Sequence, residues 1–283
     1  MAKALEKLNN KIDYHHHLLL NSVNTFEKTI VDDGGIDRIL DLLYHSFIFL
    51  VVHFRFEEHT ISLVNLNLLS ELETEHRRLL LELPPMDKWA FMVANHSAEL
   101  LSILNEDFTV THFLWERKFF SELPRLDFPS SKYPTSSGVM IMLYFESALL
   151  IKLIGSGNLS EYHQLLRQFT KTRLKGKIIP NAQLIVDLSD WSFTKDDSHT
   201  HKENLKDLFH IENLRPNLII TPLYKENFVF KELLNPTDDI ITSTTELIHL
   251  IDTKNIEIGF LQDALVIGNY SDYETYFSDF LGL

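Results

Sequence analysis

The stretch HFRFEEH, residues 53–59, decides how the first half of this chain is interpreted. Apolar residues around it recur every three or four positions, which is the spacing of an amphipathic helix. His53 and Glu57 are four residues apart, so a helix places both side chains on one face, on successive turns. An imidazole and a carboxylate presented in this way are the ligands that helical bundles offer to buried metals.

Three further segments with helical spacing each carry a histidine. His16 lies in IDYHHHLLLNSVN, His76 in ELETEHRRLL and His112 in TVTHFLWERKFF. Inward histidines on four separate helices are much less expected by chance than a single pair on one helix. We therefore predict that these histidines and Glu57 converge in the core of an all-α four-helix bundle.

This pattern resembles the bacterial hemerythrin family, whose members are four-helix bundles that hold two irons and bind dioxygen. The resemblance covers roughly residues 10–122. The second-helix motif of the family, HFxxEE, is matched by His53, Phe54, Glu57 and Glu58. The first-helix pattern, IDxxH followed by an apolar run and VN, is matched by Ile12, Asp13, His16, Val23 and Asn24. The match selects His16 over His15 and His17, which we interpret as surface or packing residues.

The third and fourth helices match the family motifs in part. In the third-helix motif HxxxH the second histidine falls on His76, but Leu72 occupies the first position. In the fourth-helix motif HxxxxD the histidine falls on His112, and Arg117 stands at the aspartate position, one residue after Glu116. The resemblance implies five metal ligands: His16, His53, Glu57, His76 and His112. Glu116 is a candidate replacement for the missing carboxylate.

The resemblance implies that the bundle binds one or two iron ions and binds or senses dioxygen or a related small ligand. Two alternatives stay open. If Arg117 points inward, it forms an ion pair with Glu57 in place of a metal, and the bundle is a metal-free interaction scaffold. Leu72 at a ligand position favours the same alternative. The lost ligands also leave coordination positions free, as an iron-dependent oxidase or peroxide-scavenging enzyme requires, although we expect binding rather than turnover.

The composition bounds the function further. The net charge of −14 and the pI near 5.4 disfavour binding to nucleic acid and to anionic lipid surfaces. The absence of cysteine excludes disulfides, thiolate metal sites and cysteine nucleophiles. The first residues, MAKALEKLNNKIDYHHH, lack the apolar core of a signal peptide, so we expect a cytoplasmic protein without membrane insertion. The sequence allows a homodimer and does not require one.

The proline- and serine-rich stretch LPRLDFPSSKYPTSSG divides the chain. We predict a hemerythrin-like bundle at 1–122, a linker at 123–138 and an α/β domain at 139–283. In the second half strand-like and helix-like runs alternate, including a short strand predicted at 256–260. Their order, together with LIVDLSDW, resembles STAS and Sec14-like domains of bacterial signalling proteins, which implies an unknown signalling protein as partner. We interpret Asp187 and Asp190 as solvated turn acids.

Overall fold

The computed structural model describes residues 2–63, 66–121, 138–156, 183–191, 215–220, 239–241, 243–253, 256–268 and 270–283. The chain forms two compact units. The helical unit comprises Met1–Lys132 together with Glu274–Leu283, and the sheet unit comprises Tyr133–Tyr273. The order predicted from the sequence, a helical part followed by an α/β part, is therefore correct.

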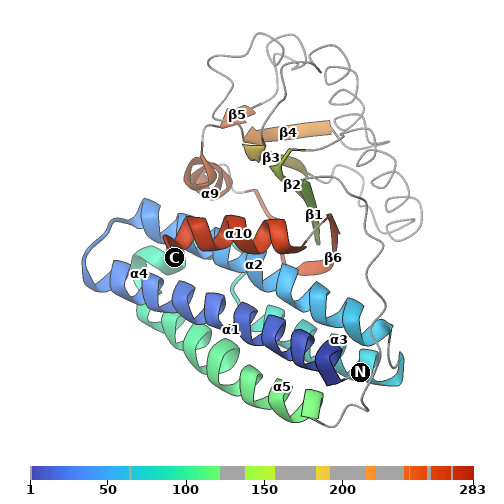
Figure 1. Ribbon diagram of the computed structural model, residues 1–283. Coiled ribbons are helices and arrows are strands. Elements are labelled where there is room, and N and C mark those ends of the chain that lie inside the picture. The colour runs from blue at the N-terminus through green and yellow to red at the C-terminus, as the bar shows by residue number, and fades with distance from the viewer. Residues whose placement is uncertain are drawn as a thin grey trace. The chain divides into compact units, whose positions relative to one another are not determined.

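The helical unit begins with three long helices that lie side by side (Figure 1). They are α1 (Ala2–Val31), α2 (Ile36–Ser62) and α3 (Leu66–Glu82). The turn between α1 and α2 needs Gly35, whose φ of 83° lies in the left-handed region that residues with a side chain rarely adopt. Helix α2 is long and apolar enough to cross a membrane, but 83% of its most apolar window is buried inside the structure, as in the core helix of a bundle.

A run of consecutive helical segments, with a kink at His96 where the backbone is not helical, completes this part of the unit. It runs through the short 3₁₀ helix η1 (Met86–Lys88), α4 (Trp89–Ser102), the π-helical segment η2 (Ile103–Thr111) and α5 (His112–Ser121). A π-helix has more residues per turn than an α-helix, so η2 changes the face that the following residues present. The residues of α5 consequently meet the core in a phase that regular helical spacing does not predict.

The last helix, α10 (Tyr270–Leu281), returns to the helical unit from Glu274 onward. Phe277 stacks on Phe49 of α2 with ring centroids 4.3 Å apart, and the Tyr276 hydroxyl lies 3.2 Å from Nδ1 of His45. These aromatic contacts explain why the structure departs from the predicted 139–283 domain, which placed the whole closing segment in the second half. Residues 123–137 of the predicted linker lie outside the described residues.

The sheet unit is built on a mixed sheet with the strand order β5-β4-β3-β2-β1-β6. Its elements are β1 (Gly138–Phe145), β2 (Ala148–Gly155), β3 (Gln183–Trp191), β4 (Arg215–Ile220), β5 (Asp239–Ile241), α9 (Thr244–Thr253) and β6 (Leu261–Gly268). Strand β1 pairs antiparallel with β2 and β6, whereas the pairs β2-β3, β3-β4 and β4-β5 are parallel. Residues 256–260, predicted as a strand, precede β6 instead of forming it.

A buried ion pair joins two parallel strands. Lys152 of β2 and Asp187 of β3 are register partners without solvent exposure, and Nζ lies 2.7 Å from Oδ2. Asp190 accepts a second bond from the same ammonium group at 2.6 Å. Burial alone lowers the pKa of Lys152, but the two carboxylates outweigh it and raise the pKa, so the ammonium stays charged. The interpretation of Asp187 as a solvated turn acid was therefore wrong.

Candidate metal centre

Six buried side chains from four helices meet inside the helical unit, and we call them the candidate metal centre. Helix α1 supplies one of them, α2 two, α3 one and α5 two. None is more than 7% exposed. The six residues are His16, His53, Glu57, His76, His112 and Glu116. The structure thus brings together the five ligands predicted from the sequence and the replacement carboxylate.

Glu116 lies at the middle of this group. Its Oε2 is 2.5 Å from Nε2 of His16, and its Oε1 is 2.5 Å from Nε2 of His112. The same Oε1 lies 3.6 Å from Nε2 of His53 and 3.9 Å from Nε2 of His76. One carboxylate therefore faces all four imidazoles.

Glu57 faces two of the imidazoles. Its Oε1 lies 3.8 Å from Nε2 of His53, and its Oε2 lies 3.3 Å from Nε2 of His76. These two histidines come from α2 and α3, so the Glu57 carboxylate spans the gap between these helices. Each of its oxygens is directed to a different side of the centre.

The six residues form two overlapping sets of four. One set is His16, His53, Glu57 and Glu116, and the other is Glu57, His76, His112 and Glu116. Within each set the donor atoms lie within 4.8 Å of one another, close enough to surround one ion. Because both sets contain both carboxylates, the arrangement could hold two metal ions, with the carboxylates shared and two imidazoles for each ion.

The polar atoms of the centre depend on one another or on a bound cation. The facing Nε2 atoms of the four histidines and both oxygens of each glutamate have no hydrogen-bond partner outside the centre among the described residues. Inside the centre they contact one another, as in the 2.5 Å contacts of Glu116 with His16 and His112. A buried polar group left unsatisfied costs about 1–3 kcal/mol, and native structures hold few of them. When both are ionised, the two carboxylates place a formal charge of −2 in the core, which divalent cations would offset.

A carboxylate outside the centre fixes the orientation of His76. The Nδ1–H of His76 donates to Oε1 of Glu58 at 2.9 Å, and Arg55 binds the other oxygen of Glu58. Once the ring is neutral, with its proton on Nδ1, its Nε2 lone pair would face the centre, as in metal-binding histidines. The ring of Phe54 stacks on His76, with centroids 4.0 Å apart and planes at 7°. Two residues of the HFxxEE motif thus hold a ligand on another helix.

The two carboxylates differ in acidity without a metal. Burial, followed by the nearby charge of Glu116, raises the pKa of Glu57 well above its usual value. Burial acts in the same direction on Glu116, but His112 and then His16 and His53 outweigh it and lower the pKa of Glu116 well below the usual value. Glu57 therefore holds a proton that a metal must displace, while Glu116 is ionised.

The histidines also differ in pKa. Burial lowers the pKa of His53 well below its usual value, so its ring is neutral and able to bind a metal. Burial lowers the pKa of His112 in the same way. Burial works against the charged form of His76 as well, but hydrogen bonds with Glu116, Glu57 and Glu58 outweigh it and raise the pKa to about 10.

Leu72 and Arg117 stand where the family pattern has metal ligands, and neither is part of the candidate metal centre as described. Leu72 is fully buried and packs with Ile61 and Phe119 in an apolar cluster. The side chain of Arg117 lies outside the described residues, so its predicted ion pair with Glu57 stays a prediction. Glu116 takes the place of the expected aspartate because it stands four residues after His112, on the same face of the regular helix α5.

Sequence reasoning missed His15. Its ring is fully buried, and its Nδ1 lies 3.3 Å from Nδ1 of His53. Its Nε2 lies 2.7 Å from Oε1 of Glu274 on α10. A signal was present in the sequence, because His15 precedes Leu18 and Leu19 by three and four residues and so shares their buried face.

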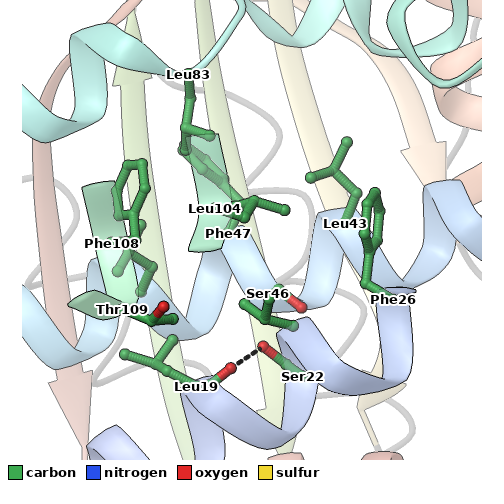
Figure 2. Close-up of a pocket in the computed structure, with 12 residues that line it drawn as sticks. Leu19, Ser22, Phe26, Leu43, Ser46, Phe47, Leu83, Leu104, Phe108 and Thr109 are labelled. Atoms are coloured by element: carbon green, nitrogen blue, oxygen red, sulfur yellow. Dashed lines mark hydrogen bonds between the residues drawn. The ribbon is translucent and has the colours of Figure 1, made fainter. Parts of the chain in front are cut away.

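An apolar cavity of ≈ 30 Å³ lies in the helical unit (Figure 2). One water molecule needs roughly 10–15 Å³, so the space is large enough for a diatomic molecule. Its walls include Phe26, Phe47 and Phe108, with the hydroxyls of Ser22 and Ser46 to one side. The Ser22 hydroxyl is already engaged, because it donates to the Leu19 carbonyl at 2.8 Å.

The cavity is close to the candidate metal centre along the helices. Leu19 and Leu50 line it, and they stand three residues from His16 and His53, one helical turn away on the same faces. A small apolar molecule held there is thus adjacent to the donor set that contains these two histidines.

Comparisons of the chain with family models, with curated proteins and with solved structures found no match.

Proposed function

We propose that the helical unit is a hemerythrin-like four-helix bundle that binds two iron ions at the candidate metal centre and binds or senses dioxygen or a related small ligand. One observation supports this proposal most directly. The six donor side chains form two overlapping sets that share Glu57 and Glu116, and all six are buried without a hydrogen-bond partner outside the centre among the described residues.

The donor chemistry favours iron. Imidazoles combined with carboxylates suit iron, and two histidines with a carboxylate and open positions are typical of non-heme ferrous sites. Each set supplies four side chains, which leaves positions free on an ion that takes five or six ligands. Bound iron supplies electrons that dioxygen accepts.

The chain's own residues prepare the site for a small ligand. Glu58 and Phe54 hold the ring of His76 in one orientation, and Phe113 stacks on His16 with centroids 3.9 Å apart. The largely apolar cavity beside Leu19 and Leu50 admits a diatomic molecule, to which the buried Ser46 hydroxyl, without a hydrogen-bond partner among the described residues, offers one polar contact. The site therefore favours a small, weakly polar ligand over an organic substrate.

The first test is the metal content per chain of protein purified from iron-supplied cells, measured with the visible spectrum in the presence and absence of dioxygen. We expect about two irons per chain and bands that depend on dioxygen. About one iron would restrict binding to one of the two sets. No iron, even after anaerobic reconstitution, would overturn the proposal and leave the metal-free scaffold.

A matched pair of variants sharpens this test. Glu116→Gln alters the carboxylate that both sets share, so both irons should be lost. Glu99→Gln makes the same chemical change on the same helical path at an exposed position and should retain both. Equal iron contents in the two variants would contradict the role of Glu116. Loading with zinc in parallel shows whether the site prefers a four-coordinate ion.

We propose in addition that the sheet unit is a STAS-like module that passes the state of the bundle to a signalling protein. Its antiparallel pair β1-β2 followed by the parallel strands β3 and β4 supports this resemblance. The test compares which proteins the full chain captures in its ferrous and ferric states. A partner that binds both states equally would contradict signalling through the metal.

A further inference from the structure

A line of hydrogen-bonding groups leads from the candidate metal centre to the last helix of the chain. Nε2 of His53 faces the centre, and its Nδ1 lies 3.3 Å from Nδ1 of His15. On the other side of the His15 ring, Nε2 lies 2.7 Å from Oε1 of Glu274. The same Oε1 is 3.0 Å from Nζ of Lys11. The line thus joins α2, α1 and α10.

The groups in this line are buried as far as Glu274, whereas Lys11 at its end is partly exposed. His53 and His15 have no solvent exposure, and Glu274 is 9% exposed. The ring of His15 is also held by edge-on contacts with Phe49 and His53, both with centroids 5.4 Å away. Buried polar groups of this kind have no water to replace a lost partner, so each depends on the next one in the line.

A metal at the centre would fix which group donates and which accepts in each hydrogen bond of the line. An ion bound to Nε2 of His53 requires the ring proton on Nδ1, which then donates to Nδ1 of His15. His15 must in turn carry its proton on Nε2, from which it donates to the carboxylate of Glu274. A hydrogen bond to an ionised acceptor is stronger than one between neutral groups. Without a metal, the ring proton of His53 can instead lie on Nε2, which faces the carboxylate of Glu116 at 3.6 Å.

We propose that His15 and Glu274 are positioning residues that link metal binding at His53 to the docking of helix α10 on the helical unit. The inference rests on the proposed metal site and adds a form of regulation to it. Metal at the centre strengthens the bond between His15 and Glu274 and so holds α10 in place. By thermodynamic reciprocity, docking of α10 strengthens metal binding by the same factor.

Helix α10 connects the sheet unit to the helical unit along the chain, so a change in its docking can affect both. Its first turn, Tyr270–Tyr273, belongs to the sheet unit, and the helix follows β6 after one residue. Within the helical unit α10 is otherwise held by the Phe277–Phe49 stack and the contact of Tyr276 with His45. A metal-dependent change in docking therefore acts on a helix that continues directly from the sheet unit.

The test measures metal retention and α10 docking in the full chain, with manganese(II) alone as a probe that does not react with dioxygen. In the unmodified protein, metal should slow amide hydrogen exchange of residues 274–281. Loss of an outer-shell partner typically lowers metal affinity by about 10–100-fold. Glu274→Ala should lower manganese affinity within this range and abolish the effect of metal on exchange.

Two further variants separate this link from a general loss of packing. His15→Phe keeps a ring against Phe49 but removes both nitrogens, so it should reproduce the effects of Glu274→Ala. Glu58→Ala removes the outer partner of His76, which has no connection to α10. This control should weaken metal binding to a similar extent and yet keep the metal-dependent slowing of exchange in α10.

The outcomes distinguish the inference from the proposed function. If the unmodified protein binds no metal, the proposed function fails and the link fails with it. If it binds metal, but α10 exchanges equally fast with and without manganese, only the link is overturned. Manganese affinity that is unchanged in both Glu274→Ala and His15→Phe would also overturn the link, whatever the iron content.

Discussion

Glu116 is the residue on which the candidate metal centre depends most, because its two oxygens approach all four imidazoles. Glu57 has a complementary role as the second shared carboxylate. Without a metal only one of the two is ionised, because the pKa of Glu57 is raised and that of Glu116 is lowered. A metal-free core of this kind stores protons that metal binding must release.

We expect metal binding at the candidate metal centre to release protons. The pKa of His76 is raised to about 10 and that of Glu57 lies well above its usual value, so both groups hold protons at neutral pH. Metal ligands must be deprotonated, so binding releases these protons and affinity should rise with pH, by about tenfold per pH unit for each proton released. Calorimetric manganese titrations in buffers of different ionisation enthalpy measure this number.

The control for proton release is Glu58→Gln. This change removes the charge that helps to raise the pKa of His76, so the variant should release fewer protons at the same pH. A manganese affinity that stays constant between pH 6 and pH 8 would contradict the assignment of His76 as a ligand.

At the scale of single residues, the sequence predicted which side chains share one face of a helix, because helical spacing alone determines this. His53 and Glu57 share a face in any helix, so their pairing followed from spacing alone. Glu116 could be named only as a candidate, because it follows His112 by four residues, whereas the family motif places its carboxylate five residues after the histidine. The partner of His15 could not be found, since Glu274 is 259 residues away in the chain.

Among the elements, β2 and β3 show how a buried charge supports a strand pair. Lys152 and Asp187 face each other in a parallel register, and a shift of one residue would separate them. Spacing alone predicted these strands, because their apolar runs are continuous. It did not predict that a lysine within such a run is matched by a carboxylate on a neighbouring strand.

This pair carries a stability prediction. Asp187→Asn leaves the buried ammonium of Lys152 with one ionised partner, Asp190, and should destabilise the sheet unit by up to about 3 kcal/mol. The double variant Lys152→Met with Asp187→Leu removes both charges and should recover much of that loss. Urea unfolding followed by fluorescence measures both changes. If the double variant is less stable than Asp187→Asn, the attraction between Lys152 and Asp187 stabilises the sheet unit by more than the cost of burying the two charges.

For the whole molecule, the two units differ in how metal should affect them. All six residues of the candidate metal centre belong to the helical unit, and its core is separate from that of the sheet unit. A ligand stabilises only the structure that binds it, by about 2.7 kcal/mol at a concentration one hundred times its dissociation constant. Manganese should therefore raise the unfolding temperature of the helical unit and leave that of the sheet unit unchanged.

Scanning calorimetry of the full chain tests this expectation, because units that unfold separately give two transitions. The matched control is Glu116→Gln, which should show the same two transitions without the manganese-dependent shift. A shift confined to the sheet unit would place the metal outside the candidate centre. A shift of both transitions together would mean that the two units unfold as one.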